Sequence, residues 1–195
     1  MHKLYFRYGT MNSSKTTSLL TTAHNYASTG RKVIIIKPEI DTRAGKTTVF
    51  SRCGLSREAD VVLSARDTVR VPHAESVDCI LVDEAQFLTP SQVDDLRQLT
   101  KYSPVIAYGL RTDSQVRLFP GSMRLMEVAD SIEEIKMICT HCSKKSTVNA
   151  RFEMSSDGRK RIIYDADQIA IGGEDMYMAL CYSCWEGMRE GYVKE

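Results

Sequence analysis

Residues 3–26 read KLYFRYGTMNSSKTTSLLTTAHNY and join a strand pattern to a helix pattern through a short polar loop. Leu4 and Phe6 lie on one face of an alternating segment, which predicts a strand that ends at Gly9. From Lys15 the apolar residues recur at helical spacing as far as Tyr26, and a β-branched run follows at residues 33–36. Strand, helix and strand within about 35 residues are typical of a parallel βαβ unit and so of an α/β fold.

The loop at residues 9–16 reads GTMNSSKT and differs at one position from the GxxxxGK[ST] phosphate loop, because Ser14 replaces the second glycine. In such a loop, backbone N–H groups surround phosphates at a helix N-terminus, a lysine adds positive charge, and a hydroxyl helps to hold Mg²⁺. An ordinary turn before a helix is the alternative. The candidate phosphate-binding residues are Gly9, Thr10, Met11, Asn12, Ser13, Ser14, Lys15 and Thr16.

A second part of a nucleotide site is predicted after the apolar residues 79–82, which continue into Asp83 and Glu84. Two carboxylates at a strand end can supply a Mg²⁺ ligand and a group that accepts the proton of an attacking nucleophile. A solvated acidic turn is the plainer reading. Together with the phosphate loop, the pair favours binding of a nucleoside triphosphate.

Further elements extend the α/β pattern along the chain. Residues 89–99 begin with a capping box and a first-turn proline, which predicts a helix, and residues 104–108 read as another strand. The predicted strands end at Gly9, Lys37, Asp83 and Gly109, the edge where open α/β sheets bind ligands. We expect residues 1–135 to form a P-loop parallel-sheet nucleotide-binding domain and residues 136–195 a smaller second domain.

Four of the six cysteines form two CxxC pairs, and they are Cys139, Cys142, Cys181 and Cys184. Two such pairs supply the four thiolates that tetrahedral Zn²⁺ prefers, and four protein ligands leave no open position, so the zinc is expected to be structural. Two disulfides or a redox-active CxxC are the alternatives. His141 lies inside the first pair and can replace a sulfur.

The composition excludes several classes of protein. The 195 residues carry 26 Lys+Arg against 25 Asp+Glu, a balance that argues against a general nucleic-acid or anionic-membrane binder. No apolar run approaches the roughly 20 residues that cross a bilayer, and the N-terminus MHKLYFRYG lacks the apolar region of a secretory signal. We therefore expect a cytoplasmic protein with no membrane partner.

Further motifs occur in a fixed order: DTR at residues 41–43, DEAQF at 83–87, YGLRTD at 108–113, and IGG followed by Tyr177 between the CxxC pairs. With Met11 in the phosphate loop, they resemble the type II, zinc-containing thymidine kinase family over residues 3–185. The resemblance implies transfer of the γ-phosphoryl group of ATP to the 5′-hydroxyl of thymidine or deoxyuridine, with Mg²⁺. It also implies a homotetramer, a role in nucleotide salvage, and inhibition by thymidine triphosphate.

The resemblance also assigns roles to single residues. Glu84 is implied as the general base, Lys15 as the cation at the transferring phosphate, and Thr16, Asp41 and Asp83 as the magnesium site. Without the resemblance, Asp41 and Arg43 read as a surface ion pair. The implied ATP-binding set adds Arg43, Asp83, Glu84, Ala85 and Gln86 to the loop residues.

A nucleoside pocket is implied on the same grounds. The resemblance makes residues 136–195 a small zinc-ribbon-like lasso domain that closes over the nucleoside, with a lasso segment that reads the pyrimidine through backbone hydrogen bonds. Its expected residues are Met11, Phe87, Leu110, Ser114, Phe119, Gln168, Ile169, Ala170, Ile171, Gly172 and Tyr177. Ser114 stands where the family commonly has phenylalanine, so we expect weaker or broader nucleoside selection. Ser14 is a second departure, and it bears on loop geometry and ATP affinity.

Two other functions are weighed against this one. A zinc-ribbon P-loop ATPase or nucleic-acid-binding module can use the same loop, with a basic cluster at Lys144, Lys145, Arg159, Lys160 and Arg161 as its contact surface. The balanced charge and the lack of an aromatic-basic RNA signature argue against it. An inactive structural relative is the third reading, if Ser14 disables the loop.

Overall fold

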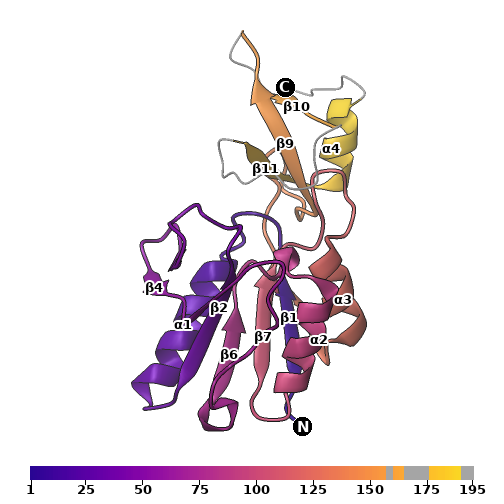
Figure 1. Cartoon of the computed structure of the whole chain (residues 1–195). Helices are drawn as coiled ribbons and strands as arrows, with labels where there is room; N and C mark the ends of the chain where they lie inside the picture. Colours follow the sequence, from indigo (N-terminus) through magenta and orange to yellow (C-terminus); the bar gives the residue numbers. More distant parts are fainter. Residues whose placement is uncertain (157–159, 165–175, 190–195) are drawn as a thin grey trace.

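The computed structural model describes residues 1–156, 160–164 and 176–189 and confirms the α/β fold class (Figure 1). Its larger part is a six-stranded sheet in the order β5-β2-β6-β7-β1-β8, in which every recorded pairing is parallel. The strands are β1 (Leu4–Tyr8), β2 (Val33–Pro38), β5 (Val61–Leu63), β6 (Cys79–Val82), β7 (Val105–Gly109) and β8 (Ser131–Glu134).

Three helices cover the two faces of this sheet: α1 (Lys15–Ser28), α2 (Pro90–Leu99) and α3 (Pro120–Val128). Helix α1 packs its apolar stripe on one face, where Ile35 and Leu81 are fully buried. Helices α2 and α3 cover the other face, where Ile36 and Ile80 are fully buried. Neighbouring strand residues thus enter different cores, because side chains alternate along a strand. This explains why the buried strands lack polar faces.

The structure refines the predicted β1–α1–β2 connection and confirms the predicted start of α2. The first strand and the next one are parallel, as expected, but β6 and β7 lie between them, so α1 crosses over two strands instead of joining direct neighbours. The capping box is confirmed: the Gln92 amide N–H donates to Thr89 Oγ1 (3.2 Å) and the Thr89 N–H donates to Gln92 Oε1 (3.0 Å). The reciprocal pair satisfies N–H groups that the start of α2 would leave unpaired.

The carboxyl ends of the six parallel strands share one edge, which faces the smaller part of the molecule (Figure 1). A two-stranded hairpin, β3 (Thr48–Phe50) and β4 (Ser56–Glu58), lies near the N-terminal end of α1 at the same edge. A short 3₁₀ helix η2 (Ala85–Phe87) follows β6 there. Another, η1 (Ala74–Ser76), lies before β6.

The smaller part is an antiparallel sheet in the order β10-β9-β11 with a helix packed beside it. Its elements are β9 (Val148–Met154), β10 (Lys160–Ile162), β11 (Tyr177–Leu180) and α4 (Tyr182–Arg189). Val148, Phe152, Leu180 and Trp185 form its apolar core together with two of the CxxC cysteines. The division of the chain at residue 135 stays a prediction.

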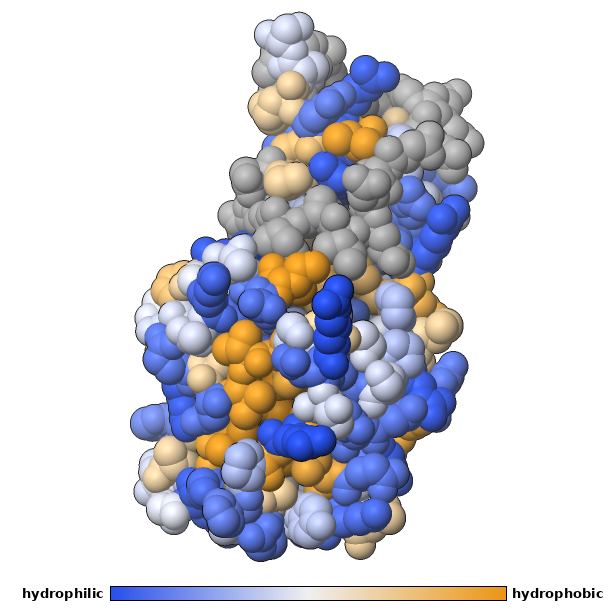
Figure 2. All heavy atoms as spheres, viewed as in Figure 1, coloured by the Kyte–Doolittle hydropathy of each residue, from blue (hydrophilic) through white to orange (hydrophobic). Residues whose placement is uncertain are grey.

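The surface of the larger part carries both hydrophobic and charged residues. In the view of Figure 2, hydrophobic residues gather over the middle of the larger part and charged residues lie around them. Among the described residues, no helix combines the length and the apolar character needed to cross a membrane.

Candidate functional site

The phosphate loop connects β1 to α1 and contains two residues with a left-handed backbone conformation, which its sequence does not indicate. Asn12 (φ 67°) and Ser14 (φ 61°) are both left-handed, a backbone region in which glycine is the unstrained residue. Ser14 accepts the amide N–H of Ser18 (2.9 Å), so the first helical turn begins at this residue. Gly9 is sterically required, because a Cβ there would lie 2.5 Å from the carbonyl oxygen of Ile135.

Lys15 folds back over this loop with its side chain buried. Its Nζ donates to the carbonyl oxygens of Thr10 (2.7 Å) and Gly9 (3.2 Å). Burial lowers the pKa of Lys15 to about 8, although the charges of Glu84 and Asp83 oppose this effect. The ammonium group therefore lies in the loop close to acidic side chains. There it can donate hydrogen bonds to phosphate oxygens in place of the backbone oxygens.

The acidic strand end meets the loop from β6. Thr16 Oγ1 donates to both carboxylate oxygens of Asp83, at 3.2 and 3.3 Å. Burial raises the pKa of Asp83 to about 7, and the charges of Glu84 and Asp41 add to the effect. A hydroxyl on the first turn of a P-loop helix and a carboxylate at a strand end are hard oxygen ligands suited to Mg²⁺. The structure brings Thr16 and Asp83 together, and their role as magnesium ligands stays a prediction.

Glu84 takes a left-handed conformation (φ 48°) and is held by two side chains. One of its oxygens forms an ion pair with Arg43, and the other accepts Gln86 Nε2 at 2.5 Å. Gln86 Oε1 in turn accepts the amide N–H of Leu110 (2.9 Å), so the carboxylate is connected to the end of β7. Ala85, buried between them, begins η2.

Asp41 and Arg43 form a short chain of alternating charge that ends at Glu84. Arg43 Nε donates to Asp41 Oδ1 (2.6 Å), and the fully buried Lys37 lies 3.4 Å from Asp41 Oδ2. Burial tends to raise the pKa of Asp41, but the hydrogen bond and the charge of Arg43 outweigh it and leave the pKa below its usual value. Burial likewise opposes the charge of Arg43, yet attraction to Glu84 and Asp41 raises its pKa. The pair is therefore not isolated at the surface, because Asp41 is buried and Arg43 connects it to Glu84.

Several predicted pocket residues lie on the same side of the sheet. The rings of Phe87 and Phe119 meet edge to face with centroids 5.8 Å apart. Met11 and Ser114 are buried, whereas Leu110 and Tyr177 are half-buried. Burial raises the pKa of Tyr177. The expected lasso residues Gln168, Ile169, Ala170, Ile171 and Gly172 lie outside the described residues.

Two residues of the smaller part that we did not predict also reach the site. Asn149 on β9 is buried; its Oδ1 accepts the Met11 amide N–H (2.7 Å) and its Nδ2 donates to the Thr112 carbonyl (3.2 Å). The Ser146 hydroxyl lies 2.7 Å from that of Thr10. In the sequence, Asn149 lies in the segment VNARFEM, where Arg151 and Glu153 are polar as well, so no local pattern distinguishes it.

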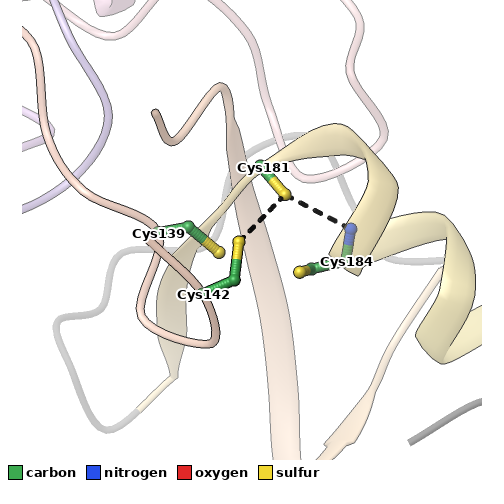
Figure 3. Close-up of side chains that lie close together, drawn as sticks. All are labelled: Cys139, Cys142, Cys181 and Cys184. Carbon is green, nitrogen blue, oxygen red and sulfur yellow. Dashed lines mark hydrogen bonds between the residues drawn. The ribbon is translucent and has the colours of Figure 1, made fainter. Parts of the chain in front are cut away.

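The four CxxC cysteines converge at one point (Figure 3). Their sulfurs all lie within 4.8 Å of one another, and those of Cys142 and Cys181 are 3.7 Å apart. A tetrahedral zinc with Zn–S bonds of about 2.3 Å sets its sulfurs roughly 3.8 Å apart, so the cluster fits this ion. All four thiols are free, in contrast to the disulfide alternative. His141 is exposed and lies outside the group.

The chain is similar to known proteins over nearly its whole length. Residues 2–185 match the family model described as thymidine kinase. A thymidine kinase of Chromobacterium violaceum is 43% identical over 187 residues, which cover 95% of this chain and 98% of the relative. That of Streptococcus pyogenes serotype M3 is 43% identical over 185 residues (93% and 95%), and that of Rhizobium meliloti 40% over 200 residues (98% and 100%).

A solved structure, Bacteroides Pif1 bound to ssDNA, is similar at a TM-score of 0.41 and 15% identity, and it covers 68% of this chain and 38% of its own. So weak a likeness says nothing about function. The family match, by contrast, spans the phosphate loop, the acidic strand end and both CxxC pairs. The chain belongs to the thymidine kinase family.

Proposed function

We propose that this protein transfers the γ-phosphoryl group of ATP to the 5′-hydroxyl of thymidine or deoxyuridine, in the salvage of DNA precursors. The single observation that carries the proposal is the position of Glu84. It follows β6 at the edge where Lys15 occupies the phosphate loop, and two neighbouring side chains hold its carboxylate. The family membership adds the identity of the acceptor.

In this mechanism, the 5′-oxygen attacks the γ-phosphorus, the bond to the β–γ bridging oxygen breaks, and ADP leaves. The hydroxyl proton passes to Glu84, since an ionised carboxylate can accept it. The N–H groups of residues 9–16 and the ammonium of Lys15 hold the phosphates. Arg43 is paired with Glu84, and its transfer to the phosphates would free that carboxylate to act as the base.

Thr16, Asp83 and Asp41 are the residues that would hold magnesium directly or through water. Bound there, the ion would neutralise charge on the phosphate oxygens. Zinc in the CxxC cluster is structural, since four thiolates complete a tetrahedral shell. The ATP site includes Ala85 and Gln86 beside the base.

The nucleoside is proposed to bind among Met11, Phe87, Leu110, Ser114, Phe119 and Tyr177, with residues 168–172 as the lasso. Ser114 removes an aromatic wall, so we expect broader nucleoside selection than an aromatic residue would give. Ser114→Phe should raise kcat/KM for thymidine several-fold. An unchanged value in a folded variant would argue against this role of Ser114. A homotetramer, inhibition by thymidine triphosphate and a cytoplasmic location complete the proposal.

The function is tested by incubating the protein with ATP, Mg²⁺ and a panel of deoxynucleosides. Monophosphate formed from thymidine or deoxyuridine supports the proposal. Phosphate release that DNA stimulates, without nucleoside product, supports the ATPase alternative, and no reaction supports an inactive relative. Glu84→Gln should lower kcat by about 100-fold or more while ATP still binds. The exposed Glu75→Gln serves as the matched control, and near-native turnover of Glu84→Gln would remove Glu84 from the role of base.

A further inference from the structure

The turn at the tip of the β3–β4 hairpin, residues 51–55, is fixed against the first turn of α1. The Ser51 hydroxyl lies 2.7 Å from that of Thr17, and Ser51 is only 2% exposed. Within the turn, the Ser51 N–H donates to the Leu55 carbonyl (2.8 Å) and the Gly54 N–H donates to the Ser51 carbonyl (2.9 Å). Gly54 has a φ of 90°, which only glycine adopts without strain. The turn therefore has a defined position beside the phosphate loop.

Arg52 is the next residue of this turn, and its guanidinium reaches the loop. Its NH1 donates to the side-chain oxygen of Asn12, one of the two left-handed residues of the phosphate loop. Its charge also acts on Lys15: after burial, the positive charges of Arg43 and Arg52 contribute to the low pKa of that ammonium. A cation outside the predicted site therefore lies within electrostatic reach of the residue that meets the phosphates.

The chemistry of this contact favours a phosphate as a better partner. Asn12 offers Arg52 a neutral amide oxygen, whereas a phosphate offers charged oxygens in a geometry that the planar guanidinium can bind in bidentate fashion. An incoming polyphosphate brings negative charge within reach of Arg52, whose positive charge already acts on Lys15. The turn itself would not have to move far, because it is already docked on α1.

We propose that Arg52 is a phosphate-binding residue of the ATP site, carried over the loop by the β3–β4 hairpin. The inference rests on the proposed function, because it takes ATP as the ligand. It adds a cation and a whole structural element to the site, neither of which belongs to the residues expected from the sequence motifs.

Arg52→Gln and Arg52→Lys test the proposal, with the exposed Arg66→Gln as the control. Loss of a charge-assisted hydrogen bond should raise the KM for ATP about tenfold or more in Arg52→Gln. The KM for ATP should rise less in Arg52→Lys, since lysine keeps the positive charge but lacks the paired N–H donors of the planar guanidinium. The KM for thymidine and the Tm should stay at their native values.

Equilibrium binding separates this inference from the proposed reaction. The Kd for ADP and ATP should rise in Arg52→Gln, whereas the Kd for adenosine should not. A native protein that binds ATP but phosphorylates no nucleoside would refute the proposed function and leave this binding test intact. An ATP KM and Kd within twofold of native in Arg52→Gln, or an equal loss for adenosine, would overturn the role of Arg52.

Discussion

Replacing Ser14 with glycine should stabilise the protein without improving its use of ATP. Ser14 has φ 61° and ψ 27°, and its side chain makes no capping hydrogen bond. An L-residue in this region costs about 1–2 kcal/mol. Glycine removes that strain but loses roughly 0.5–1 kcal/mol through the greater freedom of the unfolded chain. The net gain is about 0–1.5 kcal/mol, which for a chain of this size raises the Tm by up to roughly 6 °C.

The Ser14→Gly substitution should leave ATP binding nearly unchanged. The backbone N–H of residue 14 remains, and the native loop already starts its helix with the Ser18 N–H bonded to the Ser14 carbonyl. We therefore expect the KM for ATP to stay within about twofold. This outcome would make Ser14 a tolerated departure from the loop pattern, in contrast to the reading in which it inactivates the protein.

Thermal unfolding and ATP-dependent kinetics on two matched variants check the reasoning. Ser14→Ala keeps the Cβ and so the strain, and its Tm should equal that of the native protein. Ser28→Gly, at the exposed end of α1, should lower the free energy of unfolding by about 0.5–1 kcal/mol. A lower Tm for Ser14→Gly, or a tenfold rise in kcat/KM for ATP, would refute the idea that the serine only strains the loop.

Three further outcomes are expected. The pKa values of Asp83 and Lys15 are about 7 and 8. The kcat/KM for ATP should therefore rise with pH as Asp83 ionises and fall as Lys15 loses its proton, with a maximum between the two pKa values. A flat profile from pH 6 to 9 would contradict this expectation. Metal analysis should find about one zinc per chain, and Cys139→Ser with Cys142→Ser should lose both zinc and stability; a double variant that keeps native stability and activity would exclude a structural ion. Asn149→Leu should raise the KM for both substrates several-fold. Asn149→Asp keeps an oxygen that can accept the Met11 N–H of the phosphate loop, so it should raise the KM for ATP less. Equal increases in the KM for ATP in the two variants would argue against this role of the side-chain oxygen.

The fold could be predicted from the sequence wherever local pattern and burial agree. The strands at β2, β6 and β7 are mainly apolar runs, β1 alternates with Leu4 and Phe6 on one face, and α2 has a capping box that local contacts alone specify. The sheet order could not be read in the same way, because pairing β1 with β7 depends on contacts about 100 residues apart. Short strands such as β5 and β8 carry too few residues to show a period.

The site divides in the same manner. Residues joined by a short motif, such as Lys15 and Thr16, follow from the sequence because the loop and helix fix their spacing. Arg43 does not, since a cation two residues from an aspartate is usually a solvated pair, and only the fold brings it to Glu84. The positions of Asn149 and Arg52 depend on long-range contacts that no local pattern encodes.

Those long-range contacts also explain why a small metal-binding part belongs in an enzyme of this kind. Met11 serves both the phosphate loop and the expected nucleoside pocket, and its amide is held by Asn149 from β9. A strand that sets such a contact must itself be rigid, yet its apolar core is small. Zinc in the cysteine cluster would fix the ends of this unit, because metal binding adds folding free energy that a small core cannot supply. The structural metal would then act on catalysis indirectly, by holding the strand that positions the loop.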